Sequence, residues 1–316
     1  MNTRSEIKLF VILSAVSMMF FFGCQTSDVI TSDRNPQDYA HPESIVSTDW
    51  MQTHLDNPDI RIVDCIVPFI NPTSFSEGHI PGAVPLDVIA EISDAKGRVP
   101  LLILPENEFE TLMGKLGISN DTTVVVYDAF GSTFAARLWW ALMYYGHNDV
   151  KILNGGLGKW KAEGRALETE STESSKAVFK AVVQPSLLSN IEDVKQAIEQ
   201  PDIYLVDALT EDHYFGRKPF SPMLAPPGHI PTAINIPGPS NISMETGVLL
   251  SPVELTEHWR KLKARPQDKV ITYCGAGHYG AFDLFALYQI GYKRISLYDG
   301  SWIEWKSDPE RIIAVK

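Results

Sequence analysis

One cysteine lies in a sequence context that suits nucleophilic chemistry. Cys274 directly follows an apolar run that predicts a buried strand, and Gly275, Gly277 and Gly280 come after it, ahead of a helical pattern. Glycines let a short loop curl so that its backbone N–H groups point inward, and the start of a helix adds the positive end of its dipole. We therefore expect the loop to lower the pKa of the Cys274 thiol and to hold an anionic sulfur or substrate group.

The other two cysteines have different surroundings. Cys65 leaves an apolar strand without a glycine loop and is expected to be a buried small side chain. Cys24 ends an apolar run that Arg4 and Lys8 precede, which is typical of a signal peptide. The ending Phe21-Phe22-Gly23-Cys24 resembles a bacterial lipobox, with Phe21 where leucine is usual. We expect residues 1–23 to be a signal peptide and Cys24 to be lipidated; an uncleaved anchor or a plain secretory peptide remains an alternative.

This sorting signal predicts a lipid-anchored protein on the periplasmic side of a bacterial cell envelope. Gln25, rather than aspartate, follows the cysteine, which favours the outer membrane in Gram-negative bacteria. Residues 24–43 are polar without periodicity and are expected to form a tether. The expected partners are therefore a membrane, reached through the lipid anchor, and small molecules.

Composition excludes several classes of protein. The 316 residues are 44% hydrophobic and 21% charged, which is ordinary for globular domains. The formal net charge of −12 repels phosphate backbones, so a nucleic-acid partner is not expected. No cysteine or histidine cluster has zinc spacing, so we expect neither a metal site nor a cofactor.

The elements that must position Cys274 occur twice along the chain. Residues 60–64, 78–87 and 124–128 have counterparts at 203–207, 228–237 and 270–274. Each copy alternates short β-branched runs with helical patterns, which predicts an α/β fold with a mostly parallel sheet flanked by helices. We expect a first domain at residues 44–168, a linker at 169–184 and a second domain at 185–316.

These motifs together resemble the tandem-domain rhodaneses, the thiosulfate and 3-mercaptopyruvate sulfurtransferases. The likeness covers about residues 44–310 and rests on two Gly-His-Ile-Pro elements, the VVVYD segment, the YCGAG segment and the YDGSWIEW segment. It implies two rhodanese-like domains, of which the first is inactive, with Asp128 at the position equivalent to Cys274. It also implies that Cys274 takes a sulfane sulfur from a small donor as a persulfide and passes it to a thiol or cyanide acceptor.

Several positions depart from the pattern of mercaptopyruvate enzymes. Ala276 replaces a loop serine, and Leu209 and His213 stand at the two positions of carboxylate-binding arginines. We therefore expect thiosulfate to be the preferred donor, with positive charge supplied by His278 and Arg217. Asp64 aligns with a first-domain aspartate near the cleft, although a structural role at the strand end is an equal alternative. The expected substrate-binding residues are Gly275, Ala276, Gly277, His278, Tyr279, Gly280, Arg217 and Asp64, beside the catalytic Cys274.

Two competing functions are weighed against sulfur transfer. Phosphatases that share this fold need an arginine at the sixth position after the cysteine, and Gly280 stands there, so that function is excluded. A non-catalytic lipoprotein that senses persulfide or binds a redox partner remains an alternative, because the two arginines are missing.

Overall fold

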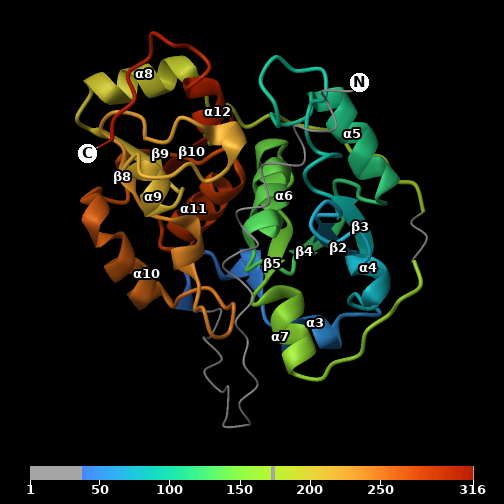
Figure 1. Cartoon of the computed structure of the whole chain (residues 1–316). Helices are drawn as coiled ribbons and strands as arrows, with labels where there is room; N and C mark the ends of the chain where they lie inside the picture. Colours follow the sequence, from blue (N-terminus) through green and yellow to red (C-terminus); the bar gives the residue numbers. More distant parts are fainter. Residues whose placement is uncertain (1–37, 172–174, 316) are drawn as a thin grey trace.

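The computed structural model describes residues 38–171 and 175–315, which form two halves of the same design (Figure 1). Each half contains a five-stranded sheet, in the order β1-β5-β4-β2-β3 in the first and β6-β10-β9-β7-β8 in the second. Every pairing between neighbouring strands is parallel. This confirms the predicted α/β fold with two parallel sheets flanked by helices.

The helices and strands follow one another in the same order in both halves. The first half contains β1 (Ile45–Val46), α3 (Thr48–Thr53), β2 (Ile60–Ile66), α4 (Ser74–Glu77), β3 (Val84–Asp87), α5 (Glu106–Lys115), β4 (Thr123–Tyr127), α6 (Thr133–Tyr144), β5 (Val150–Leu153) and α7 (Gly156–Ala162). The second contains β6 (Leu188–Ser189), α8 (Ile191–Glu199), β7 (Ile203–Asp207), α9 (Glu211–Tyr214), β8 (Ile234–Asn235), α10 (Pro252–Trp259), β9 (Lys269–Tyr273), α11 (His278–Gln289), β10 (Arg294–Tyr298) and α12 (Ser301–Trp305).

Local sequence signals explain where two of these helices begin. Asn190 caps α8 and Ser251 caps α10, and each forms a reciprocal capping box with the acidic residue three positions later. Pro252 occupies the first turn of α10, where its missing N–H costs nothing. Both helices thus begin at a cap residue that can be recognised in the sequence.

The two halves pack against each other through α6 and α11, which lie between the two sheets (Figure 1). Trp139 of α6 meets Phe285 of α11 edge to face. Arg137 of α6 forms an ion pair of 2.6 Å with Asp299, and their side chains are 0% and 3% exposed. This pair crosses the interface, so a shift of one half along the other would separate two opposite charges that both stay buried.

Equivalent residues of the two halves form the same hydrogen bond across the interface, one at each end of it. Asn154 follows β5 and accepts a hydrogen bond from the Leu249 N–H of the other half at 2.9 Å. Asp299 follows β10 and accepts one from the Ile103 N–H at 2.8 Å. The duplicated sequence thus produces the same contact in both directions across the interface.

Some residues expected to be tether or linker pack against the folded halves. Tyr39 is 3% exposed, and its hydroxyl donates to the carbonyl oxygens of Leu249 and Leu250. Phe179, within the expected linker, is 2% exposed and meets the ring of Phe109. Burial of these aromatic rings extends the fold beyond the boundaries that sequence polarity indicated.

The expected signal peptide, Cys24 and the first part of the expected tether lie outside the described residues. Between Asp38 and Val315, apart from residues 172–174, no helix is both long enough and apolar enough to cross a bilayer.

Candidate functional site

Cys274 lies directly after β9, the central strand of the second sheet, at the carboxyl end where ligands bind in open parallel sheets. The loop of residues 274–280, called the catalytic loop below, leads into α11. Backbone N–H groups of Ala276, Tyr279 and Gly280 hydrogen-bond to the Cys274 sulfur. The predicted cradle of loop amides is therefore formed around the sulfur atom.

The pKa of the Cys274 thiol differs from the sequence-based expectation. Burial raises it above the ordinary value, the three N–H donors oppose that rise, and the negative charge of Asp207 adds to it. The expectation of a lowered pKa was wrong for the free thiol, because the spacing of glycines carries no information about how deeply the sulfur is buried. Cys274 is 3% exposed.

Ser301, at the first position of α12, supports the catalytic loop from behind. Its Oγ accepts hydrogen bonds from the Cys274 N–H at 3.2 Å and the Gly277 N–H at 3.1 Å, and donates to the Tyr298 carbonyl at 2.9 Å. Its φ of 51° lies in the left-handed region, which a serine adopts at a cost in free energy. The sequence analysis missed this residue; the signal was its place in the repeated segment, where the first half has Gly156 with a φ of 52°.

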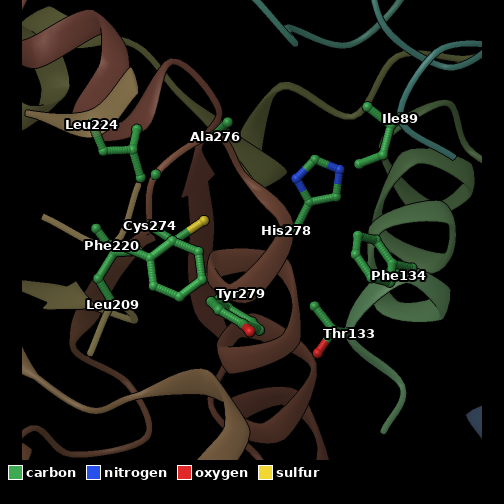
Figure 2. Close-up of a pocket in the computed structure, with 11 residues that line it drawn as sticks. Ile89, Thr133, Phe134, Leu209, Phe220, Leu224, Cys274, Ala276, His278 and Tyr279 are labelled. Carbon is green, nitrogen blue, oxygen red and sulfur yellow. The ribbon is translucent and has the colours of Figure 1, made fainter. Parts of the chain in front are cut away.

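A cavity of about 50 Å³ that is partly open to solvent lies beside Cys274, and Figure 2 shows the side chains around it. Ile89, Thr133 and Phe134 come from the first half and the other lining residues from the second, so the site exists only where the halves meet. The second half contributes Leu209, Phe220, Leu224, Cys274, Gly275, Ala276, His278 and Tyr279. Of the predicted loop residues, Gly277 and Gly280 lie in the same loop but do not line the cavity.

His278 lies in the cavity wall as a neutral ring. Burial, and to a smaller extent the positive charge of Arg137, lower its pKa to about 3. Its ring meets Phe134 of the first half edge to face, and its Nε2 has no hydrogen-bond partner among the described residues. The expectation that His278 supplies positive charge near neutral pH was wrong, because that charge would have to be buried against apolar rings and beside a cation.

Two other predicted residues do not reach the cavity. Arg217 is exposed, pairs with Asp212 at 2.9 Å and lies over the ring of Phe215. Asp64 is buried in the first half, where it accepts a hydrogen bond from the Tyr127 hydroxyl at 3.0 Å. Burial raises the pKa of Asp64 to about 7. Neither residue is among those that line the cavity beside Cys274, and Asp64 lies within β2 with its hydrogen bond inside the first half.

The two positions that the sequence analysis matched to the arginines of mercaptopyruvate enzymes are uncharged. Leu209 lines the cavity. His213 is buried, accepts a hydrogen bond from the Phe220 N–H through Nδ1, and has a pKa lowered by burial to about 4. Phe220 and Leu224, in the segment between α9 and β8, complete the cavity wall and were not found from the sequence.

The equivalent loop of the first half holds a carboxylate instead of a thiol. Asp128 accepts four backbone hydrogen bonds, from the N–H groups of Phe130, Ser132, Phe134 and Ala135, at 2.7 to 2.9 Å. Burial raises its pKa, and these four bonds oppose the rise. The amide cradle of the first half is thus filled by the protein itself.

Comparison with known proteins agrees with this duplicated architecture. Residues 47–163 and 190–308 both match the family described as Rhodanese-like domain. The chain is 35% identical over 277 residues to the sulfur carrier protein TtuD of Thermus thermophilus, a match that covers 84% of this chain and 95% of that protein. It is 33% identical to the thiosulfate sulfurtransferase of Rattus norvegicus, with 84% and 94% covered. The crystal structure of SseA from Escherichia coli, described as a 3-mercaptopyruvate sulfotransferase, aligns with a TM-score of 0.74 at 30% identity and covers 82% of this chain and 98% of that one.

Proposed function

This chain belongs to the rhodanese-like family, and on that premise we propose that it is a sulfurtransferase that carries sulfane sulfur as a persulfide on Cys274. The observation that carries the proposal is the Cys274 sulfur held by three loop N–H groups at the edge of a cavity between the two halves. The relatives named above act on thiosulfate or mercaptopyruvate, or carry sulfur, and the cysteine here has the geometry for that chemistry.

The reaction proceeds in two displacements on the same sulfur atom. The Cys274 thiolate attacks the outer sulfur of thiosulfate, the sulfur–sulfur bond of the donor breaks, and sulfite leaves with the electron pair. An acceptor nucleophile, a thiol or cyanide, then attacks the outer sulfur of the persulfide and releases the Cys274 thiolate. The loop N–H groups stabilise the negative sulfur in both steps, because they already point at the atom where charge develops.

Thiosulfate is the favoured donor over 3-mercaptopyruvate. A mercaptopyruvate carboxylate is best held by a planar arginine with paired hydrogen bonds, and the two corresponding positions are the uncharged Leu209 and His213. Thiosulfate is compact and can place its charge against the loop N–H groups and the positive end of α11. Among the described residues, no arginine or lysine lines the cavity, so we expect a high KM even for thiosulfate.

The proposed place of action is the periplasmic side of a bacterial envelope, with the mature protein anchored through a lipid on Cys24. This rests on the apolar run that ends in Gly23-Cys24. The test is mass spectrometry of the mature N-terminus together with fractionation of the wild type and Cys24→Ser. A mature N-terminus at another residue, or equal release of both proteins into the soluble fraction, contradicts it.

The central experiment is sulfur loading in the presence of thiosulfate, followed by mass spectrometry of each cysteine. Only Cys274 should gain a sulfur, turnover with thiosulfate and cyanide should vanish in Cys274→Ser, and Cys65→Ser should retain most activity. Cys65 is a matched control because it is also buried, at 1% exposure, but lies within β2 and not in a glycine loop. Loading without turnover would favour the alternative function, a persulfide-sensing or partner-binding protein.

A further inference from the structure

The walls of the cavity beside Cys274 are mostly apolar, although the proposed sulfur donor is a small anion. Its five large apolar side chains come from both halves of the molecule; they are Ile89, Phe134, Leu209, Phe220 and Leu224. Figure 2 shows Leu209, Phe220 and Leu224 near Cys274, and Ile89 and Phe134 beyond the His278 ring. No aspartate, glutamate, lysine or arginine is among the lining residues that the structure describes.

The titratable side chains nearest to the cavity are paired, uncharged or hydrogen-bonded within the protein, so they offer no charge to a substrate. Arg137 lies behind Gly277, but its guanidinium is fully buried and paired with Asp299. Burial keeps the His278 ring uncharged near neutral pH. Asp128 is held by four backbone N–H groups of its own loop. A carboxylate or sulfonate that entered the cavity beyond the catalytic loop would therefore lose its water without gaining a partner.

We propose that the sulfur acceptor of this enzyme is an uncharged organic thiol whose hydrocarbon part packs against the apolar walls on both sides of Cys274. This inference rests on the proposed persulfide chemistry and names the acceptor that the cavity selects. The enclosed part of the cavity, about 50 Å³, opens toward solvent, so a small thiol can reach Cys274 while its hydrocarbon part lies along the apolar walls. Removing hydrocarbon from water is the main source of affinity that such walls can offer.

The transfer step balances without an oxidant or reductant. The acceptor sulfur attacks the outer sulfur of the Cys274 persulfide and forms a new sulfur–sulfur bond. The bond between the Cys274 sulfur and the outer sulfur breaks, and Cys274 leaves as the thiolate. The proton of the acceptor thiol ends on the terminal sulfur, so the product is an organic hydropersulfide.

The first half has a function in this arrangement although its own loop is inactive. Ile89 follows β3 and Phe134 lies in the first turn of α6, and both face the catalytic loop from across the interface. Since the catalytic loop must keep its glycines and amides for the sulfur, these two side chains are positions at which the wall can vary without disturbing the nucleophile. They are the specificity-determining residues of the inactive half.

The test separates loading from discharge. Cys274 is first loaded with thiosulfate, or with inorganic polysulfide as a second donor, and the donor is removed. The persulfide is then discharged in single turnovers by ethanethiol, 1-propanethiol, 1-butanethiol and 3-mercaptopropionate, with mass spectrometry of the intact protein as readout. Each rate is divided by the rate of the same thiol with a small persulfide in solution, which removes differences in intrinsic reactivity.

We expect the corrected rate to rise about threefold to fourfold with each added methylene, which corresponds to roughly 0.8 kcal/mol of burial. The anionic 3-mercaptopropionate should be at least about tenfold slower than 1-butanethiol. Equal or faster discharge by the anionic thiol overturns the acceptor proposal. The proposed persulfide on Cys274 would still stand in that case. Failure of both donors to load Cys274 overturns the proposed function itself.

A pair of variants tests the contribution of the inactive half. Ile89→Arg places a cation in the wall, so the ratio of 3-mercaptopropionate to 1-butanethiol rates should rise at least about tenfold. Val253→Arg adds the same charge at a site that is 80% exposed and outside the cavity, and should leave the ratio unchanged. Ile89→Ala removes wall area without charge and should reduce the gain per methylene. Equal ratios in Ile89→Arg and Val253→Arg contradict the assignment of the wall.

Discussion

The two halves place the same amide cradle after the central strand of each sheet but fill it differently. In the first half the Asp128 carboxylate takes four loop N–H groups, two of them from Phe130 and Phe134. In the second half the equivalent N–H groups, of Ala276 and Gly280, hydrogen-bond to the Cys274 sulfur. The fold therefore provides an anion-binding loop twice, and only the half without an internal carboxylate can offer it to a substrate.

A second difference lies directly behind the two loops. Gly156 stands where the second half has Ser301, and both residues have a left-handed backbone. At Gly156 a Cβ atom would lie 2.3 Å from the Asp128 carbonyl oxygen, so no side chain fits. The second half accepts the cost of a left-handed serine, and its Oγ binds two N–H groups of the catalytic loop. The strained backbone thus belongs to Ser301, the residue that fixes the catalytic loop in position.

The largest expected effect on turnover comes from a substitution that makes the catalytic loop resemble the equivalent loop of the first half. In Cys274→Asp a carboxylate should occupy the amides of Ala276, Tyr279 and Gly280 as Asp128 occupies its own cradle. Turnover with thiosulfate and cyanide should fall more than about 10³-fold, because no nucleophilic sulfur remains. The variant should stay folded by circular dichroism, and measurable turnover by this folded protein would break the comparison.

The second effect is the pH dependence of turnover. The two cradles hold different groups, a thiol and a carboxylate, and these two groups titrate in different pH ranges. Burial raises the pKa of Cys274, so the thiolate fraction should increase about tenfold per pH unit between about pH 6 and pH 8. His278, with a pKa lowered to about 3, stays neutral throughout this range.

The measurement is kcat/KM for thiosulfate as a function of pH in the wild type and His278→Gln. Both proteins should show the same rise with pH. A rate that instead increases as the pH falls toward about 6.5, and does so only in the wild type, would restore the protonated His278 that the sequence suggested.

The third effect is on stability of the first half. Asp128→Ala leaves four N–H groups without their acceptor, and we expect a loss of about 2–4 kcal/mol in the free energy of unfolding. Asp128→Asn keeps one acceptor oxygen and should lose about half as much. Urea unfolding measures both. A stability of Asp128→Ala within about 0.5 kcal/mol of the wild type would show that the cradle does not need to be filled.

The smallest effect concerns support of the catalytic loop. Ser301→Gly removes the Oγ that binds the Cys274 and Gly277 N–H groups but suits the left-handed backbone, so stability should change by less than about 1 kcal/mol. We expect kcat to fall about tenfold, because the cradle is held less firmly, while Cys274 still forms its persulfide. A kcat equal to that of the wild type would reduce Ser301 to a purely structural residue.

The general architecture could be predicted from the sequence because it depends on local and repeated patterns. Strand–helix alternation indicated parallel sheets, and the copies at 60–64 and 203–207 became the equivalent strands β2 and β7. Asn190 and Ser251 stand at helix starts, and such starts can be recognised in a sequence because capping is a contact over only a few residues. The glycine pattern after Cys274 likewise predicted the loop amides that surround the sulfur.

Only the tertiary structure decided which side chains share the site and which charges they carry. Ile89 and Phe134 line the same cavity as Cys274, although they lie more than a hundred positions away in the sequence, and no spacing along the chain encodes that arrangement. Arg217, which the sequence offered as the cation, is exposed, whereas Arg137 is buried at the interface. The pKa values of Cys274, His278 and Asp64 all moved through burial, and burial is a property of the assembled fold: the free energy of a charge depends on everything that replaces water around it.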